Sequence, residues 1–166
     1  MTINNRKQFI QETLLEAGSL LLEKDTKEAT YTREKGYLAE ADLLMNEFIK
    51  TKIRSEYPND QIFSEEDDEN QRPEASALSL TWILDPICGT TNFVKKIPFF
   101  VISLCVVGSE GVLFSGIYDP SRDELFLADR KSTTLNGSQV FVSKVQKLED
   151  AIIAINCNQS SFKRDH

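Results

Sequence analysis

Residues 82–93 combine a carboxylate with a turn of the kind that binds phosphate. Asp85 ends a short apolar run, and Pro86 directly after it opposes further pairing as a strand. Gly89 permits a tight turn, and the polar residues 90–92 are types that cap a following helix. Backbone N–H groups at the start of a helix bind phosphate, and a neighbouring carboxylate binds a hard cation through oxygen. The segment therefore predicts a site for a phosphate group and a divalent cation.

A second group of carboxylates precedes this segment at the end of another strand candidate. Residues 61–64 have the character of a short strand, and Glu65, Glu66 and Asp67 follow it directly. Phosphoryl transfer to water needs oxygen ligands for Mg²⁺, donors for the phosphate oxygens and a group that orients the water. The residue types alone also fit a plainer interpretation, in which a solvated acidic run lies near an ordinary strand–turn–helix junction.

Two amphipathic helices and a series of strands must position these residues. Apolar side chains recur at helical spacing over residues 6–24 and again over residues 38–55, where Pro58 closes the second helix. The polar residues 26–36 between the helices predict a mobile loop. Apolar or alternating runs predict strands at 61–64, 82–85, 99–107, 112–118, 124–128, 139–143 and 151–155. Two helices followed by mostly antiparallel strands make an α+β fold.

The composition restricts the class of protein and its partners. Of the 166 residues, 40% are hydrophobic and 27% are charged, which is typical of a soluble globular protein. The net charge of −7 argues against nucleic acid or an anionic membrane as the main partner. The first residues lack the apolar run of a secretory signal, and Cys88, Cys105 and Cys157 are too widely spaced for a disulfide framework. These features predict a cytoplasmic protein with reduced thiols.

Residues 85–93, Asp-Pro-Ile-Cys-Gly-Thr-Thr-Asn-Phe, resemble the signature Asp-Pro-x-Asp-Gly-Thr-x-Asn-Phe of the inositol monophosphatase family. Further segments follow the order of that family, namely Asp42, residues 62–66, 97–100, Ser103, 116–120, 123–126 and 136–137. The resemblance covers nearly the whole chain. It implies that residues 1–166 form the N-terminal domain of the family's layered αβαβα sandwich, with two helices packed on a mostly antiparallel sheet, and that the C-terminal half is absent.

The resemblance also implies a role for each residue of the site, with Mg²⁺ as the cofactor. Glu66, Asp85, Cys88 and the backbone carbonyl of Ile87 stand at positions of metal ligands. Glu66 and Thr90 hold the attacking water and are the catalytic pair. Gly89 and Thr90 present N–H groups to the substrate phosphate, and Glu65 supports the ligands from behind.

Departures from the family pattern predict impaired catalysis. Cys88 replaces the second signature Asp, and a thiol is a soft and mostly protonated ligand that suits Mg²⁺ poorly. The family's Asp-x-Val-Thr before the second helix reads Gly-Tyr-Leu-Ala at residues 36–39, and its later Trp-Asp motif has no counterpart. That motif supplies a further metal ligand in the family.

The expected function is Mg²⁺-dependent hydrolysis of inositol or sugar monophosphates by two-metal-activated water, in an impaired form. The alternative is a truncated, catalytically inactive relic of the family that binds metal weakly or binds a partner. A third hypothesis is a superfamily member that hydrolyses nucleotide or sugar bisphosphates. The expected ligand is a small phosphorylated metabolite, and self-association of the chain is a further expectation because half of a sandwich leaves an apolar face bare.

Overall fold

The computed structural model describes residues 4–23, 29–32, 36–68 and 80–154, and its centre is a seven-stranded sheet. The strands are β3 (Gln61–Ser64), β4 (Thr81–Cys88), β5 (Val101–Gly108), β6 (Gly111–Asp119), β7 (Glu124–Asp129), β8 (Thr133–Leu135) and β9 (Ser138–Val140). They lie in the sheet in the order β3-β4-β5-β6-β7-β8-β9. β3 and β4 are parallel, and every later neighbouring pair is antiparallel.

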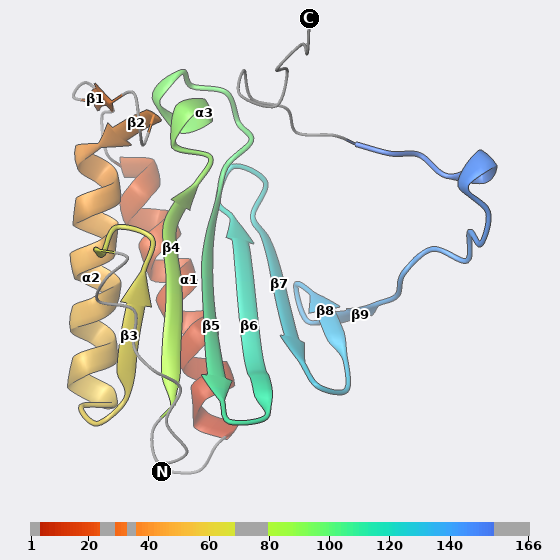
Figure 1. The fold of residues 1–166 in the computed structure, drawn as a ribbon, viewed down its shortest axis with the longest axis horizontal. Helices are drawn as coiled ribbons and strands as arrows, with labels where there is room; N and C mark the ends of the chain where they lie inside the picture. Colours follow the sequence, from red (N-terminus) through yellow and green to blue (C-terminus); the bar gives the residue numbers. More distant parts are fainter. Residues whose placement is uncertain (1–3, 24–28, 33–35, 69–79, 155–166) are drawn as a thin grey trace, which may run out of the picture.

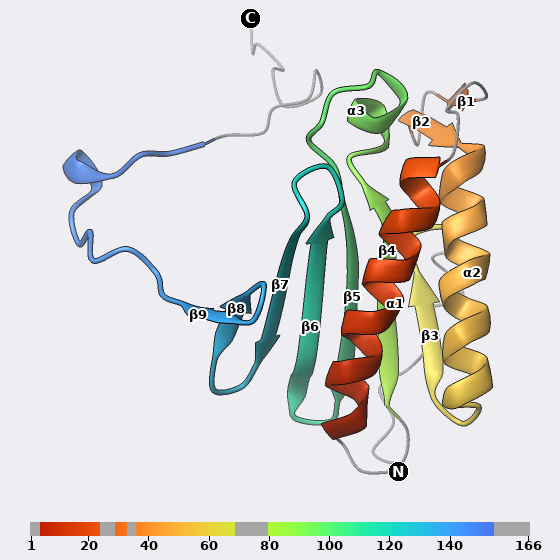
Figure 2. The ribbon, with the colours of Figure 1, turned by 180° about the vertical axis from the view of Figure 1, so that it is seen from behind.

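Two long helices, α1 (Asn4–Glu23) and α2 (Glu40–Glu56), cover one face of this sheet (Figures 1 and 2). α1 packs mainly on β5 and β6, and α2 packs on β4. The apolar positions that predicted α1, which are Ile10, Leu14, Ala17 and Leu21, are all fully buried. The predicted α+β arrangement of two helices on a mostly antiparallel sheet is confirmed. No described helix is both long and apolar enough to cross a membrane.

The structure differs from the sequence prediction in five segments. Residues 26–36 were predicted to be a loop, but β1 (Ala29–Thr32) pairs antiparallel with β2 (Gly36–Ala39), and residues 24–28 and 33–35 lie outside the described residues. The short β-type run Thr30–Thr32 was not predicted as a strand because charged residues lie on both sides of it. β4 continues past Asp85 to Cys88 because a shift in its register with β5 accommodates Pro86.

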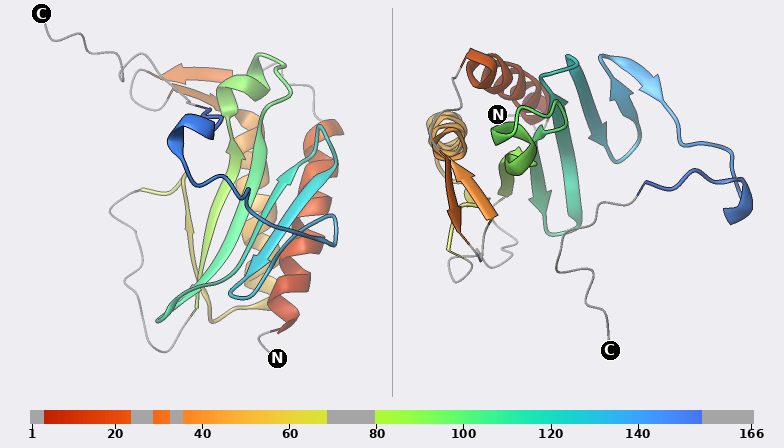
Figure 3. Two further views of the ribbon diagram at one scale, coloured as in Figure 1. Left: turned by 90° about the vertical axis from the view of Figure 1, so that its right-hand side faces the viewer. Right: turned by 90° about the horizontal axis from the view of Figure 1, so that it is seen from above.

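The remaining differences lie beyond β7. β8 was missed because its three residues are too few to show a periodic pattern. β9 ends at Val140, so residues 141–143 do not continue the predicted strand. Residues 151–154 are exposed and form no strand, and residue 155 lies outside the described residues. This segment, with a 3₁₀ turn at Leu148–Asp150, extends away from the sheet (Figure 3).

The core lies between the helices and the sheet and is centred on Trp82. This side chain is fully buried, and its indole N–H donates a hydrogen bond of 2.9 Å to Asp60. Its ring centroid lies 5.3 Å from those of Phe9 and Tyr57, which joins α1, the end of α2 and β4 in one aromatic cluster. These contacts hold both helices in position along β4, the strand that contains Asp85.

The other face of the sheet is open, and helices of the described chain do not cover it (Figure 3). Side chains alternate across β4, β6 and β7, so that Ile83, Ile117 and Phe126 point to this face and are 38%, 43% and 37% exposed. An apolar sheet face of this kind is usually covered by a further layer of protein.

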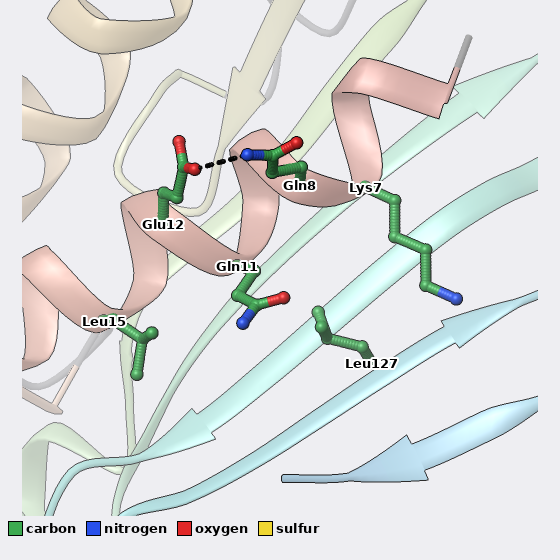
Figure 4. A pocket seen from close by; sticks show the side chains of 6 residues that line it. All are labelled: Lys7, Gln8, Gln11, Glu12, Leu15 and Leu127. Carbon is green, nitrogen blue, oxygen red and sulfur yellow. Dashed lines mark hydrogen bonds between the residues drawn. The ribbon is translucent and has the colours of Figure 1, made fainter. Parts of the chain in front are cut away.

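An ion pair joins the beginning of α1 to the end of β7. Lys7 donates a hydrogen bond of 2.7 Å to Asp129 at the end of β7. A groove of about 510 Å³ runs beside this contact, with Lys7 at one end and Leu127 on its floor (Figure 4). The Lys7 ammonium, aided by the backbone N–H of Lys131, lowers the pKa of the Asp129 carboxyl to about 2.

We expect the Asp129→Asn variant to be less stable than the original chain near neutral pH by about 0.5–1 kcal/mol, as for other partly exposed ion pairs. The pKa of Asp129 is depressed in the folded state, so its contribution is complete above the unfolded value near ~4 and is lost as the pH falls towards 2. Urea unfolding at several pH values measures this. The difference between the two proteins should shrink as the pH falls from about 4 and vanish only below about pH 2, whereas an Asp150→Asn control should follow the original chain throughout. A difference that does not depend on pH contradicts the assignment.

Candidate functional site

The parallel pairing of β3 with β4 brings the two predicted groups of carboxylates to one edge of the sheet (Figure 1). Ser64, the last residue of β3, lies opposite Leu84. The next residue, Glu65, donates its backbone N–H to the Leu84 carbonyl at 3.0 Å. Glu65 therefore lies beside Asp85, as expected where parallel strands end together.

These two carboxylates line a pocket of about 610 Å³ on the open face of the sheet. The other lining residues are Phe63, Asp67, Ile83, Leu84, Ser103 and Cys105. Most of the lining residues that lie in strands have odd numbers, because successive side chains of a strand point to opposite faces, whereas Glu65 and Asp67 lie in the turn after β3. Glu65 and Glu66 both lie in the turn that follows β3, and the backbone N–H of Glu66 donates to the Ser64 hydroxyl at 3.3 Å. The carboxylate that interacts with Asp85 is that of Glu65, to which the family resemblance assigned a supporting role.

Asp85 is a half-buried carboxyl close to other carboxylates. Its Oδ1 atom is buried and has no hydrogen-bond partner among the described residues. Burial, and secondly the negative charge of Glu65, raise the pKa of Asp85 to about 7. Both effects favour whatever neutralises the carboxylate, whether a proton or a bound cation.

Cys88 lies at the end of β4 and interacts with Asp85. Burial, and secondly the charge of Asp85, raise the pKa of the Cys88 thiol to about 11. The side chain is therefore a neutral thiol at neutral pH, in the position where the signature has a carboxylate. Among the described residues, no group of three or more His, Cys, Asp or Glu side chains is arranged to hold a metal ion.

A sharp turn connects Cys88 to the short helix α3 (Thr90–Val94). Gly89 precedes the helix with φ of +103°, and a Cβ atom there would stand 3.1 Å from the Phe99 carbonyl oxygen. Only glycine adopts this conformation without strain at such a close approach. Residues 90–92 were predicted to cap the helix, but no side chain caps it, because Gly89 occupies the cap position.

Thr90 instead points back toward α2 and β4. Its hydroxyl lies 3.0 Å from Oδ1 of Asp42 and 3.1 Å from the Ile87 carbonyl oxygen, and it donates to one of them at a time. Asp42 is 1% exposed. Sequence reasoning noted Asp42 without giving it a role in the site. The signal that could have found it is a polar stripe on α2, because Asp42, Asn46 and Lys50 recur every four residues and are all buried.

The described geometry thus brings Glu65, Asp85, Cys88 and the Ile87–Thr90 turn to one end of the sheet, with Asp42 behind the turn. A model of the inositol monophosphatase family matches residues 5–164 of the chain. Two curated relatives are Nus factor SuhB of Escherichia coli K12, which is 33% identical over 83% of this chain, and inositol monophosphatase of Dictyostelium discoideum, which is 29% identical over 94%. The matches cover 52% and 58% of those proteins, so the chain spans about half the length of these relatives.

Solved structures agree with these matches. The IMPase of Thermotoga maritima superposes with a TM-score of 0.75 at 29% identity, over 84% of this chain and 54% of its own. An IMPase/NADP phosphatase complexed with Mg²⁺ and phosphate gives a TM-score of 0.80 at 23% identity, over 91% of this chain and 58% of that one. The second likeness establishes a shared fold.

Proposed function

Because the chain belongs to the inositol monophosphatase family, we propose that it carries the metal- and phosphate-binding half of a Mg²⁺-dependent phosphomonoesterase. The substrate class is inositol or sugar monophosphates. This proposal depends most on one observation, the buried Oδ1 atom of Asp85 without a partner, next to the carboxylate of Glu65. Two crowded carboxylates of this kind suit a divalent cation.

The donor atoms at this end of the sheet suit one hard cation. Glu65 and Asp85 supply carboxylate oxygens, and the carbonyl of Ile87, two residues after Asp85 and 3.1 Å from the Thr90 hydroxyl, adds a backbone oxygen. Mg²⁺ binds to one or two carboxylates and keeps several waters, so a small set of protein ligands is sufficient. We therefore propose Glu65, in place of Glu66, as the first carboxylate ligand. When bound, Mg²⁺ would stabilise the negative charge that develops on the phosphoryl oxygens.

A second hard cation does not fit the residues present. The Cys88 thiol stays protonated at neutral pH and offers sulfur where oxygen is required. A two-metal mechanism needs ions on both the attacking and the leaving oxygen. We propose that hydrolysis by this chain is impaired for this reason, and that an inactive relic that retains weak metal binding is the main alternative.

The residues around the turn can orient water and phosphate. Asp42 accepts the hydroxyl hydrogen of Thr90, which leaves the lone pairs of the Thr90 oxygen free to accept a hydrogen bond from a water molecule. The N–H groups of Gly89 and Thr90 lie at the first turn of α3, where helix N–H groups lack partners within the helix. We propose that these N–H groups hold phosphate oxygens, with Thr90 and the carboxylate of Glu65 orienting the water.

Further protein is proposed to cover the open sheet face, since the curated relatives are about twice as long as this chain. The occupant is either the remainder of a family fold or a second copy of the chain. A cytoplasmic location and the absence of nucleic acid among the partners stay predictions. The Nus factor name of the Escherichia coli relative belongs to that protein, and no contact among the described residues favours such a role here.

Titration of the protein with Mg²⁺ or Mn²⁺ tests the proposed site. We expect Asp85→Asn to weaken binding by on the order of 10²-fold, because it removes a charged ligand and leaves its neighbours in place. Glu110→Gln is the matched control, since Glu110 is an exposed carboxylate at the opposite end of the sheet. Calorimetry or the Mn²⁺ electron paramagnetic resonance signal gives the affinities. Equal affinity in Asp85→Asn and the original chain would refute the proposed metal site.

A further inference from the structure

Lys50 is a buried cation in the middle of α2. It is 5% exposed and belongs to the polar stripe that also contains Asp42 and Asn46. Lysine is rarely buried unless it is paired. Its partner is Asp67, whose Oδ1 atom accepts a hydrogen bond of 2.5 Å from the Lys50 ammonium.

Asp67 uses its other atoms to close the turn that carries the two glutamates. Its Oδ2 atom accepts the backbone N–H of Ser64 at 2.9 Å. Its own N–H donates to the Ser64 carbonyl at 3.0 Å. Asp67 is therefore hydrogen-bonded to Ser64, at the other end of the four-residue turn 64–67, through both its side chain and its backbone. The ion pair with Lys50 connects Asp67, and with it the turn, to α2.

We propose that Lys50 is a positioning residue for the candidate site. It holds Asp67, and through it the turn 64–67, in the conformation that directs Glu65 toward Asp85. The inference rests on the proposed metal site for its consequence in binding, but the conformation of the turn is a property of the metal-free protein. Lys50 is not a ligand, because its ammonium has no lone pair to donate.

The direction in which the Mg²⁺ affinity changes distinguishes a positioning role of Lys50 from a purely electrostatic one. An ammonium near a cation site repels the cation, so its loss alone would strengthen Mg²⁺ binding. If the turn 64–67 is no longer held by the ion pair, Mg²⁺ binding becomes weaker, because part of the binding free energy is then used to order Glu65. Groups that orient ligands from behind change metal affinity by about 10–100-fold. We therefore expect Lys50→Met to weaken binding by about tenfold or more.

The chain offers a matched control on the same helix. Lys52 lies two residues after Lys50, so its side chain points to a different side of α2, where it donates a hydrogen bond of 2.5 Å to Glu16. The side chains of Lys52 and Glu16 are 27% and 57% exposed. Lys52→Met therefore also removes a lysine ion pair of α2, but one that does not involve the turn 64–67. Lys50→Arg preserves the charge and the donors and should retain most of the affinity.

Two measurements on these variants test the inference. Hydrogen exchange of the metal-free proteins should show faster exchange at the amides of Ser64 and Asp67 in Lys50→Met, by about tenfold, and no change in Lys52→Met. Mn²⁺ titration should show weaker binding in Lys50→Met alone. Unchanged exchange in Lys50→Met, or stronger Mn²⁺ binding, overturns the inference. If the original chain binds no Mn²⁺, the proposed function fails, and the exchange experiment still decides whether Lys50 holds the turn.

Discussion

Cys88→Asp is expected to tighten Mg²⁺ binding by about 10–100-fold and to leave phosphate release from inositol 1-phosphate at its background level. The first part follows from the ligand chemistry. A thiol whose pKa is about 11 is replaced by a carboxylate, which is the kind of ligand that Mg²⁺ prefers. The new charge also adds to the repulsion between Glu65 and Asp85, which a bound cation relieves.

The second part follows from the share of the fold that the chain represents. The matches cover 52% and 58% of the two curated relatives, and in the function proposed above a second hard cation does not fit the residues of this chain. Groups that act as a unit are strongly non-additive, and repair of one alone recovers little activity. A single lost electrostatic stabiliser costs on the order of 10²–10³ in rate.

Three proteins separate these effects, and each is assayed with Mg²⁺ by calorimetry and by phosphate release. They are Cys88→Asp, the uncharged isostere Cys88→Asn, and Cys88→Asp joined to the C-terminal half of a family relative. Affinity should rise in the first and third but not in Cys88→Asn, and turnover should occur in the third. Clear turnover by Cys88→Asp alone would show that these 166 residues hold a sufficient catalytic site.

Gly116→Val is expected to destabilise the protein by about 3 kcal/mol or more, because overpacking a closed core forces the backbone apart. Gly116 lies in β6 directly beneath α1. A Cβ atom there would stand 2.5 Å from Ile10 and 2.6 Å from Leu14, and both of these side chains are fully buried. Valine therefore has to push the helix away from the sheet.

Chemical denaturation measures the loss, and Ser115→Val is the matched control. Ser115 is the neighbour of Gly116 on β6, points to the opposite face of the sheet and is partly exposed, so the same branched side chain does not press on α1 there. Leu14→Ala should recover part of the stability of Gly116→Val, because it makes room beneath α1. Equal losses for the two valine variants would mean that α1 does not pack against Gly116 as described.

The long elements could be predicted from sequence because their burial is periodic. The apolar stripe of α1 and the alternation in β5 and β6 are visible without a structure, and the signature residues already indicated the Asp85 end of β4. Choosing between Glu65 and Glu66 was a different problem. It depends on which face of the sheet each side chain meets once β3 has ended in a turn, and a pair of adjacent glutamates shows no periodicity of its own.

The roles of Asp42 and Lys50 could not be predicted from the sequence for another reason. Each makes its decisive contact with a residue far along the chain, Thr90 and Asp67 respectively, and no local pattern reports such contacts. The spacing of the polar stripe on α2 indicates that these residues are buried, but it does not indicate their partners. The pairing of β1 with β2 was likewise hidden, because short strands in a charged stretch give almost no signal.

The order of the strands in the sheet has a consequence for how the chain is made. From β4 to β9, each strand pairs with the next one in sequence, so these pairings close short loops at little entropic cost. α1 is the exception, since Lys7 finds its partner 122 positions later. Synthesis runs from the N-terminus, so the apolar stripe of α1 leaves the ribosome long before β6 and β7 exist to receive it. α1 is thus made before the strands β5 and β6 that bury its apolar stripe, and it packs on the sheet only after they have been made.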